Sequence, residues 1–205
     1  MDLGMPSAGP VDLPRRRVDL EIGKRRHRRV TGPAGVLLFV CLFLPAMKGC
    51  SETIYPVTVP MFWHPYIFGL VFALGTATVS VRNLRYTIVA LRVLAWLTIA
   101  GGVFLTIASG GVGLAQIGIG GILSAAIGAR GHSERRVALT AIAAGSLSLL
   151  WFGLWVLTPE ALIGVYLSAL ASVGLVVGGL VWLGELALVR PPPIVVPRAV
   201  ARERE

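Results

Sequence analysis

The chain has 205 residues, of which 55% are hydrophobic and only 14% are charged, and its mean hydropathy is +0.78. A soluble domain carries about 25% charged residues, so this composition excludes a water-soluble fold and indicates an integral membrane protein. The net charge of +9 does not indicate nucleic-acid binding, because the cations gather in short segments between apolar runs, which is the distribution that orients membrane proteins.

Residues 1–29 show no apolar periodicity and contain three prolines, so we expect a disordered arm there. The arm ends in a dense basic block made of Lys24, Arg25, Arg26, His27, Arg28 and Arg29. An apolar run of bilayer length follows at once. This order predicts that the arm stays in the cytoplasm, where its cations contact anionic lipid headgroups.

Six apolar segments follow, and they predict an all-α integral membrane bundle of six transmembrane helices with both termini in the cytoplasm. The predicted spans cover residues 30–47, 65–81, 86–108, 112–129, 137–157 and 161–189. Pro45 should bend or end the first span. A cleaved signal peptide is the alternative for this segment, because residues 46–50 resemble a lipoprotein cleavage site, but the five later apolar segments favour an uncleaved helix. Residues 190–205 are predicted to be a disordered cytoplasmic tail.

The longest loop between predicted spans, residues 48–65, should lie outside the cytoplasm. Its β-branched segment Thr53–Val59 predicts a short extended piece of chain. Tyr55, Trp63 and His64 form a candidate outer-loop surface. Such side chains either anchor a loop at the level of the headgroups or bind a ligand or partner.

The remaining cations support this arrangement. With both termini inside, every cation except Lys48 lies on the cytoplasmic side. Those after the basic block include Arg82, Arg85, Arg130, Arg135, Arg136 and Arg190. Reversing the orientation or removing one helix would scatter them over both sides. The preference for Arg over Lys, with abundant Ala, Gly, Val and Leu, suggests a bacterial genome, so we expect a multi-pass protein of a bacterial inner membrane.

Ionisable side chains at bilayer depth are costly and mark functional sites, and the predicted spans contain few of them. Arg92 and Glu185 both belong near the cytoplasmic ends of their helices, so we predict that they pair; alternatively, the third span begins only at Val93. Gln116 is the one amide side chain in a span. No group of His, Cys or carboxylate residues has ligand spacing, and no span holds a histidine to activate a nucleophile. We therefore predict no catalytic residue, no metal site and no cofactor.

Small residues recur at four-residue spacing along the predicted spans. Lipid supplies no hydrophobic drive for helix association, so close backbone contact through small residues should hold the bundle together. The glycines predicted to make these contacts are Gly69, Gly102, Gly120, Gly128, Gly174 and Gly178. Packing within the chain is the main interpretation, and self-association is the alternative.

These observations predict a non-enzymatic accessory or scaffold component whose partners are membrane lipids and an unidentified membrane protein. A transporter or channel for a small, weakly polar solute is the alternative, and a membrane-embedded enzyme acting on lipid is the third hypothesis. A continuous polar cavity reaching mid-membrane would favour transport, because a polar solute needs a polar path. A sealed bundle would favour a structural role.

Overall fold

A computed structural model describes residues 26–50, 52–77, 81–109, 111–128 and 133–188. Across these residues it has six α-helices: α2 (Arg28–Val40), α3 (Trp63–Ala77), α4 (Val81–Ser109), α5 (Gly111–Ile127), α6 (Glu134–Val156) and α7 (Ile163–Leu188). The predicted arm and tail lie outside the described residues, and so do Lys24, Arg25, Arg130, Arg190 and the side chain of Arg82.

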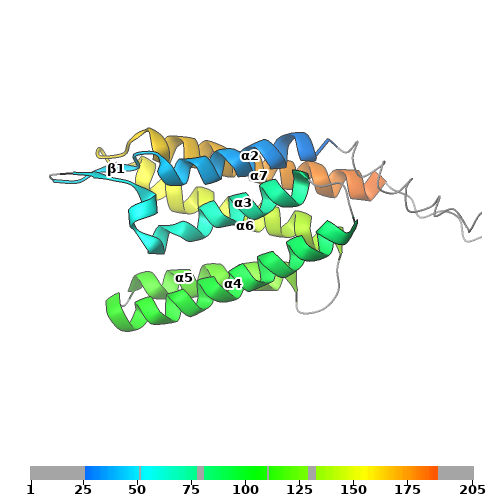
Figure 1. The fold of residues 1–205 in the computed structure, drawn as a ribbon, viewed down its shortest axis with the longest axis horizontal. Coiled ribbons are helices and arrows are strands. Elements are labelled where there is room, and N and C mark those ends of the chain that lie inside the picture. The colour runs from blue at the N-terminus through cyan, green and yellow to red at the C-terminus, as the bar shows by residue number, and fades with distance from the viewer. Residues whose placement is uncertain (1–25, 51, 78–80, 110, 129–132, 189–205) are drawn as a thin grey trace, which may run out of the picture.

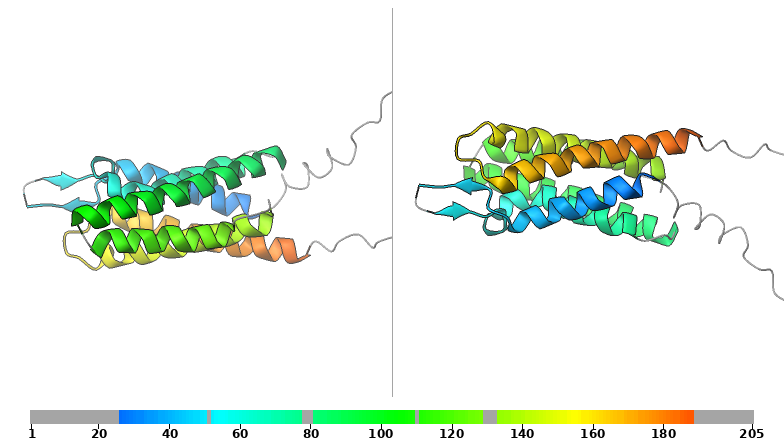
Figure 2. Two further views of the ribbon diagram at one scale, coloured as in Figure 1. Left: turned by 90° about the horizontal axis from the view of Figure 1, so that it is seen from below. Right: turned by 90° about the horizontal axis from the view of Figure 1, so that it is seen from above.

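The six helices run side by side along the long axis of the molecule (Figure 1). Each packs against its neighbours in the chain, and α7 returns to pack against α2, so the helices form a ring in chain order. The α4–α5 hairpin packs most extensively on itself and reaches the other helices through α3 and α6. Figure 2 shows this hairpin on one side of the molecule, with α2 and α7 on the opposite side.

Among the residues that the structure describes, three helices are long and apolar enough to cross a membrane, over Leu84–Ile107, Glu134–Val156 and Ile163–Leu188. The apolar helix Gly113–Ile127 is shorter. With 13 and 15 residues, α2 and α3 extend about 20 Å and 23 Å, which is less than the hydrocarbon core of about 30 Å. The predicted helical fold is therefore present, whereas bilayer length is found for three helices.

The helical segment that begins with α2 ends before Pro45, as the sequence predicted, although α2 itself ends earlier, at Val40. After α2, residues Cys41–Phe43 form one 3₁₀ turn, and Leu44 is extended, with φ −91° and ψ 152°. Leu44 precedes Pro45, and a residue before proline is driven out of the helical region by the ring. This break is also one reason why the first helix is shorter than the predicted span.

The expected extended segment is part of a small hairpin at the end of the bundle opposite the start of α2. Strands β1 (Met47–Lys48) and β2 (Thr53–Ile54) are antiparallel, with Met47 opposite Ile54. The extended part is shorter than predicted, because Pro56 begins a 3₁₀ turn. The Lys48 N–H donates to the Glu160 carbonyl at 2.9 Å. The hairpin is therefore joined to the loop between α6 and α7.

Five of the six glycines predicted to pack helices lie at close helix–helix contacts. A Cβ added to Gly69 would lie 2.9 Å from the Gly35 carbonyl oxygen of α2, and one added to Gly102 would lie 2.8 Å from the backbone nitrogen of Ile117 in α5. Gly120, Gly174 and Gly178 likewise face neighbouring helices. Gly128 differs from the prediction: its φ of +72° places it in the left-handed region that ends helices, directly after α5.

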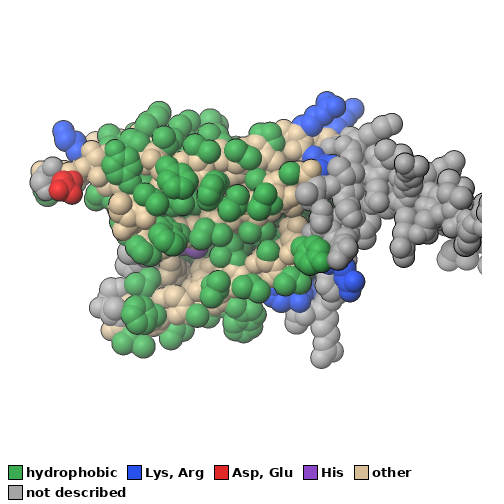
Figure 3. Space-filling view, viewed as in Figure 1, with side chains coloured by type: hydrophobic (Ala, Val, Ile, Leu, Met, Phe, Trp, Pro, Cys, Tyr) green, Lys and Arg blue, Asp and Glu red, His purple; other side chains and the backbone are tan. Residues whose placement is uncertain are grey.

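Large apolar side chains cover the outside of the bundle, among them Phe104 and Ile107, which are 72% and 84% exposed. Figure 3 shows this apolar surface running along the helices. Lys and Arg side chains gather at the end where α2 begins and α7 ends (Figure 3). Lys48 belongs to β1 in the hairpin at the opposite end (Figure 1). The described cations thus follow the predicted asymmetry between the two ends.

Candidate functional site

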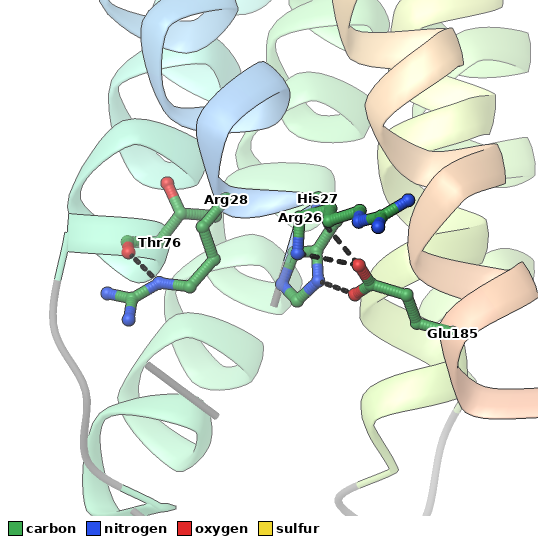
Figure 4. A network of polar contacts seen from close by, with 5 residues as sticks. All are labelled: Arg26, His27, Arg28, Thr76 and Glu185. Carbon is green, nitrogen blue, oxygen red and sulfur yellow. Dashed lines mark hydrogen bonds and ion pairs between the residues drawn. The ribbon is translucent and has the colours of Figure 1, made fainter. Parts of the chain in front are cut away.

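A polar cluster joins the start of α2 to the last turns of α7 (Figure 4). One carboxylate oxygen of Glu185, Oε1, accepts the backbone N–H groups of Arg26 at 2.6 Å and His27 at 3.3 Å. The first N–H groups of a helix lack partners within the helix, and the helix dipole makes this end positive. Glu185 therefore caps α2 from another helix.

The second carboxylate oxygen of Glu185 holds the side chain of His27. Its Oε2 lies 2.7 Å from His27 Nδ1. The imidazole is 3% exposed and stacks on Trp182, with ring centroids 4.1 Å apart and planes 8° apart. Trp182 and Glu185 are three residues apart and so share one face of α7. We call His27, Trp182 and Glu185 the α2–α7 clasp.

Sequence reasoning missed the clasp, because His27 stands in a basic block that was expected to contact lipid headgroups. The available signal was on α7, where an aromatic residue, Trp182, and an acid, Glu185, lie three residues apart near the basic end. That pattern predicts a partner for the acid on a neighbouring helix. It does not select His27 among the basic residues.

The predicted pair of Arg92 and Glu185 is wrong. Glu185 binds α2, and Arg92 Nη2 instead donates to the carbonyl of Gly128 at 3.1 Å. The sequence indicates similar depths for the two residues, but α4 and α7 are not neighbours in the ring. Depth along the bundle can be inferred from sequence, whereas position around the ring depends on which helices pack together.

Three arginines bind the C-terminal ends of neighbouring helices. Arg28 Nε donates to the Thr76 carbonyl of α3 at 2.5 Å (Figure 4). Arg136 Nη1 donates to the Ile127 carbonyl of α5 at 3.4 Å, beside the contact of Arg92. The last carbonyls of a helix lack partners and form the negative end of its dipole. Cations of this end therefore also stabilise the bundle.

A groove of about 370 Å³ lies between the start of α3 and the α4–α5 hairpin. It is lined by Pro60, Trp63, His64, Ile67, Leu94, Leu97, Thr98, Gly101, Phe104, Leu105 and Gln116. None of these side chains is charged. On the face seen in Figure 3, the surface is hollowed between the α4–α5 hairpin and the helices above it.

Two polar side chains meet in the groove. Gln116 is 7% exposed, and its Nε2 lies 3.4 Å from His64 Nδ1. The His64 ring contacts Trp151 of α6 edge-on, with centroids 6.1 Å apart. Thr98, the third polar lining residue, donates its hydroxyl to the Leu94 carbonyl at 2.9 Å. His64 and Gln116 therefore bring two hydrogen-bonding groups together in a groove that is otherwise mostly apolar.

The candidate outer-loop surface is divided between two sites. Tyr55 and Trp63 are 39% and 38% exposed, and Trp63 Nε1 donates to the Val57 carbonyl at 3.1 Å. His64 instead lines the groove with Gln116. The sequence singled out His64 and Gln116, but their contact forms where the start of α3 meets the α4–α5 hairpin, which no local pattern predicts.

Within the described ranges, no three His, Cys, Asp or Glu side chains are arranged to hold a metal ion. The groove offers hydrogen bonds and apolar contact to a bound molecule. Comparison of the chain with protein-family models, curated proteins and solved structures gives no match.

Proposed function

We propose that the chain is a six-span protein of a bacterial inner membrane, with both termini in the cytoplasm, that serves as a non-enzymatic accessory or scaffold subunit. The observation that carries this proposal is the combination of an apolar exterior with cations at one end of the ring. Such a surface suits lipid along the helices, and the cationic end suits the cytoplasmic face.

The short helices α2 and α3 are compatible with a membrane-spanning placement because side chains at their ends can reach the interface. The bilayer thins or flanking side chains extend to the interface where a span is shorter than the hydrocarbon core. Arg28 and Arg29 flank α2 at one end, and Trp63 flanks α3 at the other. All three side chains are of types that hold helix ends at an interface.

Reporter fusions test the topology. Reporters at the N-terminus and after Glu205 should both be active in the cytoplasm, because six spans return the chain to its starting side. A reporter after Ser109 should be active on the other side, because three spans precede it. Termini on opposite sides would refute the six-span arrangement. A cytoplasmic reporter after Ser109 would refute the orientation.

The accessory role predicts a partner at the outer hairpin. We expect a photoreactive residue at Tyr55, which is 39% exposed, to give one discrete protein adduct in native membranes. The matched position is Ile107, which is 84% exposed on the helical surface and should give lipid adducts instead. Lipid adducts alone at both positions would contradict the role.

The groove favours a second candidate, a carrier of a small, weakly polar solute. Its lining residues on α4 run from Leu94 to Leu105, a rise of about 16 Å, which is about half of the hydrocarbon core. A groove of this length can hold a solute within one half of the membrane but does not reach across it. The groove therefore supports binding of a solute better than its transport.

A further inference from the structure

We propose that the groove lined by His64, Gln116 and Leu97 is a binding site for a lipid that has one apolar chain and an uncharged, oxygen-bearing head. The chain would lie along α4, and the head would bind the polar side chains of α3 and α5. The inference rests on the proposed membrane placement and does not depend on the accessory role.

The polar pair is the first reason. In hydrocarbon, polar side chains cost free energy unless they are hydrogen-bonded, and those within spans mark functional sites by default. Gln116 Nε2 and His64 Nδ1 lie 3.4 Å apart in the groove, whose other lining side chains are mostly apolar. An amide and an imidazole together offer both donors and acceptors, which suits a hydroxyl, ester or ketone oxygen.

Charge is the second reason. None of the lining residues is Lys, Arg, Asp or Glu. The described arginines gather at the far end of the bundle (Figure 3). A phosphate or carboxylate group would therefore enter the groove without a counter-charge, at a high desolvation cost. An uncharged head avoids this cost.

Size is the third reason. The groove encloses about 370 Å³, within the range of roughly 300–1,000 Å³ that small-molecule sites occupy. Its length on α4 of about 16 Å matches the depth of one leaflet, about half of 30 Å.

The test uses the full-length chain in phosphatidylcholine vesicles with three photoreactive probes that share one chain length: a long-chain alcohol, the corresponding fatty acid and a phosphatidylcholine. We expect the alcohol to label residues 60–67 and 94–105 about ten times more than the phosphatidylcholine does, which is the factor that one well-made hydrogen bond provides. Excess unlabelled alcohol should suppress this labelling.

Two variants and a matched control locate the site. A Cβ at Gly101 meets nothing within 4 Å, so Gly101→Leu fills the groove without a backbone clash, and Gln116→Leu removes the amide. Both should lower alcohol labelling about ten-fold. Gly121 on α5 is equally open but does not line the groove, so Gly121→Leu should label like the wild type.

Equal labelling by all three probes would overturn the proposal, because it indicates ordinary lipid contact. Stronger labelling by the fatty acid, or full labelling of Gly101→Leu, would also overturn it. If Gln116→Leu fails to fold, Gly101→Leu still decides. Because labelling is measured on purified protein, loss of the accessory role leaves the result unchanged, and a failed topology appears only in the reporter fusions.

Discussion

Removing the carboxylate of Glu185 should open the α2–α7 clasp and destabilise the whole bundle. In Glu185→Ala, the Arg26 and His27 N–H groups lose their acceptor, and His27 Nδ1 loses its partner. The Glu185 side chain is 19% exposed and His27 is 3% exposed, so water replaces these contacts poorly. Charge-assisted hydrogen bonds contribute about 1.5–3 kcal/mol each, and a charge at a helix end contributes about 0.3–1 kcal/mol. The three contacts share one carboxylate and are not additive, so we expect the free energy of unfolding to fall by about 2–4 kcal/mol in all.

The loss should appear as a fall in melting temperature. For a chain of about 200 residues, 1 kcal/mol corresponds to about 2–4 °C, so the expected fall is about 5–10 °C. The Cys41 thiol is fully buried, and in a Cys50→Ser background its reaction with a fluorogenic thiol dye reports unfolding in detergent. Glu185→Gln should lose less stability, because the amide oxygen still accepts one backbone N–H.

Glu52→Ala is the matched control, since this acid is exposed at the other end of the molecule and surface substitutions change stability by less than about 0.5 kcal/mol. Equal melting temperatures for Glu185→Ala and Glu52→Ala would refute the assigned role of the clasp. A His27→Leu, Glu185→Ala double variant should show coupling of about 1 kcal/mol or more. Simple additivity would mean that the imidazole contributes nothing to the cap.

Two further predictions concern packing and helix ends. Gly69→Ala should destabilise the bundle by about 1–3 kcal/mol, because the new Cβ would lie 2.9 Å from a backbone oxygen of α2. In the control Gly184→Ala, the new Cβ meets nothing within 4 Å, so this variant should gain up to about 1 kcal/mol in helix propensity. Equal melting temperatures of the two variants would contradict the close contact at Gly69. Arg92→Leu should cost about 1–2 kcal/mol of folding free energy through the lost bond to Gly128. Its effect should add to that of Glu185→Ala within about 0.5 kcal/mol. A larger coupling in the thermal assay would support a direct pairing of Arg92 with Glu185.

The helices were predictable from sequence because apolar runs and basic turns are local signals. The predicted segment 137–157 contains nearly all of α6, and 161–189 contains all of α7. The extended conformation of Leu44, which stops the helical segment, follows from the geometry of Pro45. Helix length in space was less predictable, since hydropathy continues into turns such as Cys41–Phe43 that are no longer α-helical.

The candidate sites were predictable as residues but not as partners. His64, Gln116, Arg92 and Glu185 are conspicuous in an apolar sequence, because polar groups in a membrane need a reason to be there. Their contacts depend on the order of helices around the ring, which places α5 beside α4 and α7 beside α2. Nothing in the spacing of residues within one helix carries that order.

The basic residues show how one residue type meets two requirements at once. Helix ends at the cationic side leave carbonyls without partners, and in a membrane protein these groups have little water to bind. Arg28 and Arg92 bind such carbonyls on neighbouring helices, whereas Arg29 and Arg135 are exposed. Under the proposed topology, positive charge at this end has a structural part and an orienting part, and only the structural part should change the melting temperature when it is removed.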